Sequence, residues 1–249
     1  VALLLTSYVQ HLVPRGAKRT LLWVLMGVGL VAAMSRGPWV GAAIGLFVIA
    51  LASINPLSNV LKLLMASFGA AVMLVMLPGG EKILDYLPWV GSIDAGGIDF
   101  REILWQQSML VIDKSPWIGS VGFTELSEFD PIRLGDGFVD IVNTYLGVVL
   151  QLGLIGLALF VFMLLTSLVS VLRALSVNGN RNDEMSIYGV ALLAVIIATI
   201  AEIWMVSSIS QISPMVTFTV GACAAYGYLV QVARMQWLSR SSRPIVSCG

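Results

Sequence analysis

An arginine at the end of an apolar stretch is the first residue whose type suggests chemistry. Arg36 lies between Ser35 and Gly37. A guanidinium in this place is costly unless it reaches water or an anion, and small neighbours leave its planar fork open to a phosphate. The alternative is an arginine that snorkels to the membrane surface, but snorkelling favours the inner face, and the charge pattern of the chain places Arg36 outside. We therefore predict that Arg36 binds an anion.

A second arginine, Arg101, follows Asp99 at the start of a loosely amphipathic run. This pattern predicts a surface helix that lies on the membrane, with Asp99 as its N-cap. Arg101 would then stand in the first turn, where a cation opposes the helix dipole, and a base in an unfavourable place hints at function. The alternative is a salt bridge to one of the many acidic residues nearby.

Asp140 and Asn143 are three residues apart, which places them on one face of the helix that we expect over residues 140–152. A carboxylate near the membrane surface can act as a general base that accepts the proton of a sugar hydroxyl. Asp140 is equally suited to be a helix N-cap, so both readings stay open.

Three further residues are candidates for supporting roles. Glu202 lies in an apolar stretch, where an acid is a functional hypothesis by default, although pairing with an arginine such as Arg36 or Arg101 is the simpler role. Trp117 suits either stacking on a sugar face or burial at the membrane interface. Arg133 is one of the few bases in the polar part of the chain, and we count it as a possible supporting residue.

The elements that must position these residues are membrane helices. Of 249 residues, 58% are hydrophobic and 11% are charged, whereas a soluble domain has roughly 45–50% apolar and about 25% charged residues. The chain is therefore an integral membrane protein, and we expect an all-α, polytopic transmembrane helix bundle of about six spans. The six apolar stretches are residues 21–34, 39–54, 60–77, 154–172, 187–206 and 214–232.

One long polar segment, residues 78–140, interrupts the apolar stretches. It holds 11 acidic and four basic residues, a net charge of about −7 in a chain that is neutral overall. A loop of this length inside a compact fold is usually functional. Lys and Arg in the short loops orient the chain: if the basic turn at residues 14–19 is inside, nine bases fall inside, and the polar segment with its short interfacial helices lies outside.

The remaining features define the domain and exclude several classes. The chain starts at Val1 within an apolar run and without a signal-peptide pattern, so we expect a single membrane domain over residues 1–249 that lacks its N-terminal part. His11 and the two cysteines make no metal or disulfide spacing, and no glycine-rich phosphate loop is present. We therefore predict no metal and no nucleotide cofactor. A transporter or flippase is disfavoured, since we find no matched pair of interrupted helices.

Three motifs in order resemble the O-antigen ligase and O-antigen or exopolysaccharide polymerase superfamily. The first is Ser35-Arg36-Gly37 at an outer helix end, and the second is Arg101-x-x-Leu104-Trp105 leading into residues 116–123. The third is residues 140–146 followed by Gly153-Leu154-Ile155-Gly156. The resemblance covers roughly residues 20–232, the C-terminal portion of such a protein.

The resemblance implies a GT-C-like glycosyltransferase of the bacterial inner membrane with a periplasmic polar segment. The donor would be a glycan on a polyprenyl diphosphate, held by Arg36 and Arg101, and the enzyme would need no metal or nucleotide. The acceptor would be a second lipid-linked glycan or lipid A core. A chain-length regulator protein is a possible partner, and nucleic acid is not expected.

One position departs from the ligase pattern. Ligase-type members usually carry a histidine where this chain has Val142, although Asn143 remains. The variant looks more like polymerases, so the leading reading is polymerisation of lipid-linked repeats into O-antigen or exopolysaccharide, with Asp140 as acid/base candidate and Asn143 orienting a sugar. The alternative is a ligase of lipopolysaccharide biosynthesis that transfers polymer to lipid A core.

Overall fold

The structure, a computed structural model, is all-helical in the parts of the chain that it describes. These parts are residues 16–32, 36–53, 55–76, 95–133, 137, 139–177, 183–205 and 212–241. The α-helices are α2 (Ala17–Ala32), α3 (Arg36–Ala52), α4 (Pro56–Met76), α6 (Ala95–Lys114), α7 (Thr144–Val177), α8 (Glu184–Glu202) and α9 (Ile212–Ser241). Two 3-10 helices follow α6: η2 (Phe123–Glu125) and η3 (Ser127–Ile132). His11, residues 78–94 and Asp136 lie outside the described residues.

Each of the six apolar stretches falls on one of these helices, which confirms the all-α membrane bundle. Among the described residues, three helices are long and apolar enough to cross a membrane: Thr144–Val177, Glu184–Glu202 and Pro214–Trp237. The apolar helix Gly37–Ala52 is shorter. At about 1.5 Å per residue α3 spans roughly 25 Å, a little less than the hydrocarbon core of a bilayer.

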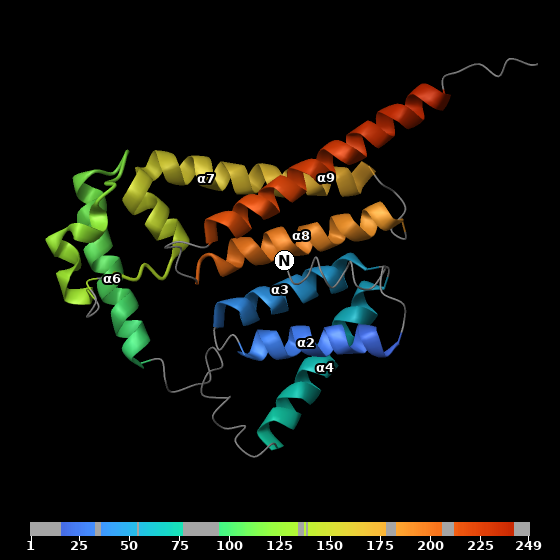
Figure 1. The fold of residues 1–249 in the computed structure, drawn as a ribbon, viewed down its shortest axis with the longest axis horizontal. Helices are drawn as coiled ribbons and strands as arrows, with labels where there is room; N and C mark the ends of the chain where they lie inside the picture. Colours follow the sequence, from blue (N-terminus) through green and yellow to red (C-terminus); the bar gives the residue numbers. More distant parts are fainter. Residues whose placement is uncertain are drawn as a thin grey trace, which may run out of the picture.

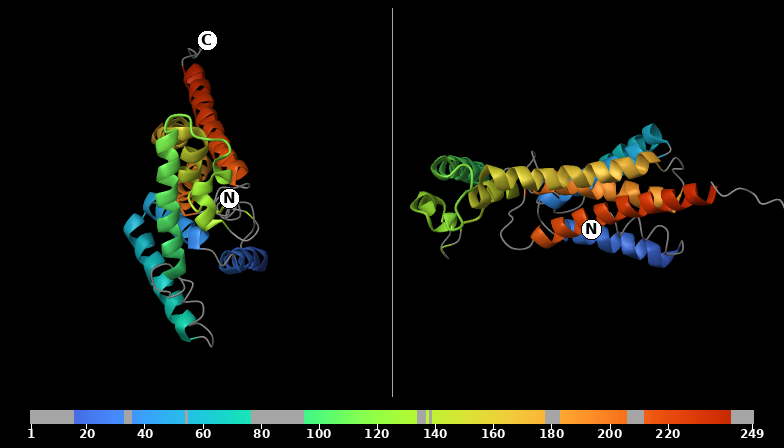
Figure 2. Two further views of the ribbon diagram at one scale, coloured as in Figure 1. Left: turned by 90° about the vertical axis from the view of Figure 1, so that its left-hand side faces the viewer. Right: turned by 90° about the horizontal axis from the view of Figure 1, so that it is seen from above.

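The centre of the bundle is built by α7, α8 and α9. They run lengthwise beside one another, with α8 antiparallel to the other two (Figure 1; Figure 2, right). Their buried side chains form one apolar cluster, in which Val171, Ile196 and Cys223 are fully covered. Ser167 lies among these apolar side chains and donates its hydroxyl to the carbonyl O of Met163 (2.8 Å), which satisfies the buried polar group inside its own helix.

α3 packs along α8 through a row of glycines (Figure 1). Gly37, Gly41 and Gly45 recur every four residues and are all buried. Small residues at this spacing let two helices approach closely inside a membrane, where packing rather than the hydrophobic effect drives association. This row was not predicted from the sequence, although its four-residue spacing is a signal that could have revealed it.

The described part of the polar segment folds against the first turns of α7. Side chains from α6, η3 and α7 form a second apolar cluster, separate from that of the bundle, and α6 with the 3-10 helices lies at one end of the molecule (Figure 2). Phe129 of η3 is fully buried there and meets Phe123 edge to face, with ring centroids 5.9 Å apart. The polar segment therefore has a core of its own.

α7 is kinked at Gly153, which has φ 69° and ψ −170°. This break separates the short first part of α7 from the long apolar part, as the sequence predicted. The turn at Gly119, with φ 66°, docks against it backbone to backbone. Three main-chain hydrogen bonds join the two: Ser120 N to Leu150 O (2.8 Å), Leu154 N to Pro116 O (2.8 Å) and Ile155 N to Trp117 O (3.3 Å).

Candidate functional site

The candidate site lies at the polar end of the bundle, which we define as the end where α3 and α7 begin and α8 ends (Figure 1). The start of α7 is tied to the end of α8 by two hydrogen bonds. Thr144 N donates to the carbonyl O of Ile203 (3.0 Å), and the hydroxyl of Tyr145 donates to the carbonyl O of Ile200 (2.9 Å). The ring of Tyr145 also lies 5.9 Å from that of Trp204. This joint fixes the polar segment relative to the bundle.

Arg36 is the first residue of α3, and its side chain lies outside the described residues. The helix start is held in place because Trp39 Nε1 donates to the carbonyl O of Leu30 in α2 (2.7 Å). The N-terminal end of a helix favours an anion through its dipole and unpaired N–H groups. Glu202, the last residue of α8, is half-buried beside Gly41, where a Cβ would stand 3.2 Å from its Oε2. The two helices thus bring an acid to the first turns of α3; whether it pairs with Arg36 stays a prediction.

The structure corrects the expected position of Arg101 within its helix. We expected Asp99 to be the N-cap and Arg101 to lie in the first turn, but α6 begins at Ala95, so Arg101 lies in the second turn. Further along the same helix, Leu104, Ser108 and Val111 form a buried stripe. Arg101 itself is exposed, and within the described residues it makes no ion pair. Its exposure leaves the guanidinium accessible to an external anion.

The structure also corrects the helix that we expected to begin at Asp140. Residues 139–143 are irregular, and α7 begins at Thr144. Asn143 is the residue that caps it: its Oδ1 accepts hydrogen bonds from the backbone N of Tyr145 (3.0 Å) and Leu146 (3.3 Å). Asp140 and Asn143 therefore do not share a helix face. Asp140 is half-buried in the irregular stretch and stays in place because the residues on either side of it are buried in the apolar cluster of the polar segment.

Trp117 is exposed at the turn that docks against the kink of α7. Its neighbours Ile118 and Val121 are also exposed, at 74% and 84%. Three exposed apolar side chains on one turn suit contact with a sugar face or with lipid, and both readings of Trp117 stay open. Val142, at the position of the ligase histidine, is half-buried against the apolar cluster of the polar segment.

A groove of about 500 Å³ opens beside the first turns of α7. Its wall includes Phe123, Thr124 and Glu125 from η2, and Gln151 from α7. Arg133 lines the same groove and is oriented by two partners. Its Nε donates to Asp130 Oδ1 (3.2 Å), from which Nη2 also lies 3.2 Å away, and its Nη1 donates to the carbonyl O of Gly137 (3.0 Å). Arg133 was named from the sequence as a possible supporting residue, and that role stays a prediction. Thr124 and Gln151 were not named, because only the fold brings these parts of the chain together.

Lys114 and Glu128 form a further ion pair within the described part of the polar segment. Lys114, at the end of α6, donates to Glu128 Oε1 of η3, and this hydrogen bond lowers the pKa of the Glu128 carboxyl below its usual value. Within the described ranges, no three His, Cys, Asp or Glu side chains lie close enough together to hold a metal ion. The described site offers arginines, carboxylates, amides and aromatic rings.

The fold and the site define a polytopic, all-helical membrane protein with a folded polar segment at one end of its bundle. A family model described as O-antigen ligase matches residues 21–161, more than half of the chain, from α2 to the kinked first half of α7. The chain belongs to the O-antigen ligase family, whose members are membrane glycosyltransferase-like enzymes, and it has an O-antigen ligase or polymerase type of function. No curated protein and no solved structure matches it.

Proposed function

We propose that this protein polymerises polyprenyl-diphosphate-linked oligosaccharide repeats into O-antigen or exopolysaccharide at the outer face of a bacterial inner membrane. The observation that supports the proposal is that the helix starting at Arg36 and the segment carrying Arg101 both lie at one end of the bundle. The start of α3 with Arg36 lies at this end, and so does the folded segment that carries Arg101. An arginine pair at the mouth of a membrane bundle suits a diphosphate whose lipid remains in the bilayer.

The reaction needs one bond to form and one to break. The hydroxyl oxygen of the acceptor sugar attacks the anomeric carbon of the donor glycan, and the bond from that carbon to the diphosphate oxygen breaks. The diphosphate leaves with the electron pair, and Arg36 and Arg101 stabilise the charge that develops on it. Asp140 accepts the proton of the acceptor hydroxyl.

Asn143 takes a role that follows from its contacts. Its side-chain oxygen caps α7, so it fixes the first turn of that helix and, through residues 140–142, the position of Asp140. Asn143 is therefore a positioning residue. In this proposal its Nδ2 group donates a hydrogen bond to a sugar hydroxyl. Val142 lies where a ligase carries its histidine, which favours the polymerase over the ligase.

The groove beside α7 suits the glycan part of a substrate. Its polar residues Thr124, Glu125, Arg133 and Gln151 offer both donors and acceptors for sugar hydroxyls, and Phe123 offers an apolar ring. The two substrates in this proposal are the lipid-linked donor glycan and the acceptor glycan. The long polar segment would face the periplasm, and a chain-length regulator would act from the same side.

The test is complementation of a polymerase-deficient strain, with the polymer separated by length on a gel. Arg36→Ala and Arg101→Ala should each reduce polymer by roughly 100-fold or more, the cost of losing one group that stabilises transition-state charge. Asp140→Asn should do the same with the fold intact. Lys114→Ala is the matched control, because Lys114 lies on α6 with Arg101 but pairs with Glu128. Normal polymer from well-expressed Arg36 and Arg101 variants would overturn the assignment.

The carrier of the polymer separates the polymerase from the ligase. If the protein is a polymerase, long chains accumulate on the polyprenyl carrier in a strain that lacks lipid A core acceptor. If it is a ligase, wild type and inactive variants give the same polymer in that strain. They then differ only in a strain that has the core acceptor, in the amount of polymer attached to core. The second result would replace our proposal with the ligase.

A further inference from the structure

An uncharged stretch, residues 115–124, follows α6 and docks against the kink of α7, although it belongs to a segment that is rich in acids. Three of its apolar side chains are exposed: Trp117, Ile118 and Val121. We call these three side chains the apolar turn patch. A contiguous exposed patch of this kind marks a surface that a membrane or another molecule covers, because water hydrates it unfavourably.

The apolar turn patch adjoins the surface that α7 turns toward lipid. Two main-chain hydrogen bonds join them, from Leu154 N to Pro116 O (2.8 Å) and from Ile155 N to Trp117 O (3.3 Å). Leu154 and Ile155 are themselves exposed. Exposed apolar side chains continue from there along α7 at Leu159, Phe162, Leu165 and Val169. Because α7 is long and apolar enough to cross a membrane, the patch is continuous with a lipid-facing surface.

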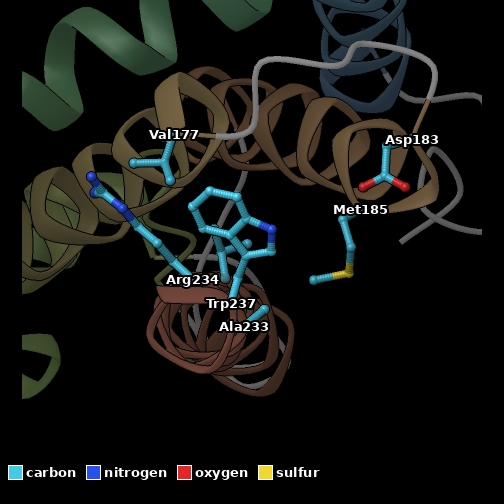
Figure 3. Close-up of a pocket in the computed structure, with 7 residues that line it drawn as sticks. Val177, Asp183, Met185, Ala233, Arg234 and Trp237 are labelled. Carbon is cyan, nitrogen blue, oxygen red and sulfur yellow. The ribbon is translucent and has the colours of Figure 1, made fainter. Parts of the chain in front are cut away.

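The length of α7 sets the height of the patch in the bilayer. At the opposite end of the bundle, Arg234 and Trp237 of α9 line a groove of about 380 Å³ beside Val177, the last residue of α7 (Figure 3). Trp and Arg side chains commonly mark a membrane boundary. From Val177 to Ile155 the helix rises about 33 Å, or about 31 Å at an average tilt of about 20°, close to the roughly 30 Å of the hydrocarbon core. The apolar turn patch therefore lies at the second boundary.

The main chain of the turn is suited to an apolar surrounding. Gly119 N donates to Ser115 O (3.1 Å), and the Ser115 hydroxyl donates back to Gly119 O (3.0 Å), which closes the turn. Ser120 N donates to Leu150 O (2.8 Å) in α7. Backbone groups that enter lipid must keep their hydrogen bonds inside the protein, because an unpaired group is costly there. These bonds let the turn enter the edge of the bilayer without losing them.

We propose that the apolar turn patch is a membrane anchor, in which Trp117, Ile118 and Val121 insert into the interfacial layer of the bilayer beside α7. The patch is thus covered by lipid rather than by a glycan. The indole of Trp117 suits this layer, because its ring is apolar and its N–H is polar. Since the turn is hydrogen-bonded to α7, the anchor holds the polar segment at a fixed height over the membrane. This role is independent of the reaction proposed above.

The test measures the depth of spin labels on the purified full chain in vesicles of phosphatidylethanolamine and phosphatidylglycerol. The labels are attached to Ile118→Cys or Val121→Cys in a Cys248→Ser background, where the remaining Cys223 is fully buried. Collisions with oxygen, which enters lipid, are compared with collisions with a nickel chelate, which stays in water. The matched control is Glu102→Cys, an exposed and charged position on α6. The oxygen-to-chelate ratio should be roughly tenfold higher at Val121 than at Glu102, since an apolar layer excludes a polar chelate at least to that extent.

Two substitutions of Trp117 test the anchor itself, each combined with the label at Val121. Trp117→Leu keeps an apolar side chain and should leave the ratio unchanged. Trp117→Asp puts a charge into the patch and should lower the ratio toward the value at Glu102. Because Trp117 is exposed, both variants should keep the thermal transition of the wild type in detergent. If the chelate reaches the labels at Ile118 and Val121 as readily as the label at Glu102, the patch lies in water, as a glycan-binding surface would. That result, or a ratio that Trp117→Asp leaves unchanged, would overturn the proposal.

Discussion

Replacing Gly153 by alanine should detach the turn at residues 115–120 from α7. A Cβ at this position would stand 2.3 Å from both the carbonyl C and O of Trp117 and 2.5 Å from the backbone N of Ile118. These atoms are main chain and cannot rotate away. The conformation itself, φ 69° and ψ −170°, is one that essentially only glycine adopts. The alanine must therefore either unkink the helix or separate the two segments.

The expected cost has two parts. Holding a non-glycine residue in this backbone conformation costs about 1–3 kcal/mol. Separation breaks all three main-chain hydrogen bonds between the segments. The two short ones, Ser120 N to Leu150 O and Leu154 N to Pro116 O, are each 2.8 Å long and contribute about 1 kcal/mol net each, and the longer third one is left out of the sum. The sum is about 3–5 kcal/mol. Because about 1.4 kcal/mol is a factor of ten, the local opening equilibrium should shift by more than roughly 100-fold.

The measurement is amide hydrogen exchange of the purified protein at Ser120 and Leu154, where exchange should accelerate by that factor. Gly147→Ala is the matched control, because it lies in α7 as well and its Cβ would meet only Ile141 Cγ2, at 3.7 Å. An alanine there should be neutral or stabilise the helix by up to about 1 kcal/mol. Exchange at Ser120 and Leu154 that stays within about threefold of wild type in Gly153→Ala would refute the reasoning.

Three smaller effects follow from single contacts of the polar segment. Asn143→Ala should destabilise the protein by about 1 kcal/mol in thermal unfolding, because the N-cap of α7 is lost, whereas Asn143→Asp should keep the stability and report on sugar binding through its activity. Ser108→Ala should raise the free energy of unfolding by about 1 kcal/mol, since the Ser108 hydroxyl is fully buried and has no hydrogen-bond partner among the described residues. A less stable Ser108→Ala variant would contradict this, because it would mean that the hydroxyl does have a partner. Lys114→Gln should be less stable than wild type at pH 7. The folded-state pKa of Glu128 is lowered, so its contribution is present above the usual value of 4.5 and is lost as the pH falls through the lowered pKa. The difference between Lys114→Gln and wild type should shrink below pH 4.5, and a constant difference would contradict the pairing.

The sequence was sufficient to predict the spans, because a backbone in lipid must satisfy its hydrogen bonds internally, and an apolar stretch then has little choice but helix. The break at Gly153 was also readable from the sequence. The family resemblance rested on short motifs around Arg36, Arg101 and Asp140, and the family match now covers all three. The spans, the break at Gly153 and the short motifs are all features that depend on the local sequence alone.

Helix starts were predicted less well, because several residues are good caps and tertiary contacts choose among them. Asp140 and Asn143 are both suitable N-caps by residue type. The structure selects Asn143, since the hydrogen bond from Thr144 N to the carbonyl O of Ile203 fixes the start of α7 against α8. Likewise Asp99 lies inside α6 because the helix begins at Ala95. The contact between Thr144 and Ile203 joins residues that are far apart in the sequence.

The groove beside α7 was beyond sequence reasoning for a different reason. Glu125 and Gln151 are 26 positions apart and meet only because the turn at Gly119 docks on the kink at Gly153. That docking depends on main-chain atoms at both positions, which leave no pattern of hydrophobic or charged side chains to read. In the sequence, only the glycines at positions 119 and 153 point to this contact, and they lie in different kinds of local sequence.

The physical consequence is that the described part of the polar segment is packed firmly against the bundle. Its own apolar core fixes α6 and η3 against α7, the glycine contact fixes the turn, and the joint between α7 and α8 transmits this to the membrane helices. α3 is fixed to the same α8 by its glycine row. Arg36 and Arg101 are thus carried by two units that share one helix as a reference. If a diphosphate binds between them, as we propose, packing sets the two helix positions that carry its donors, and preorganised charge is what stabilises a transition state most effectively.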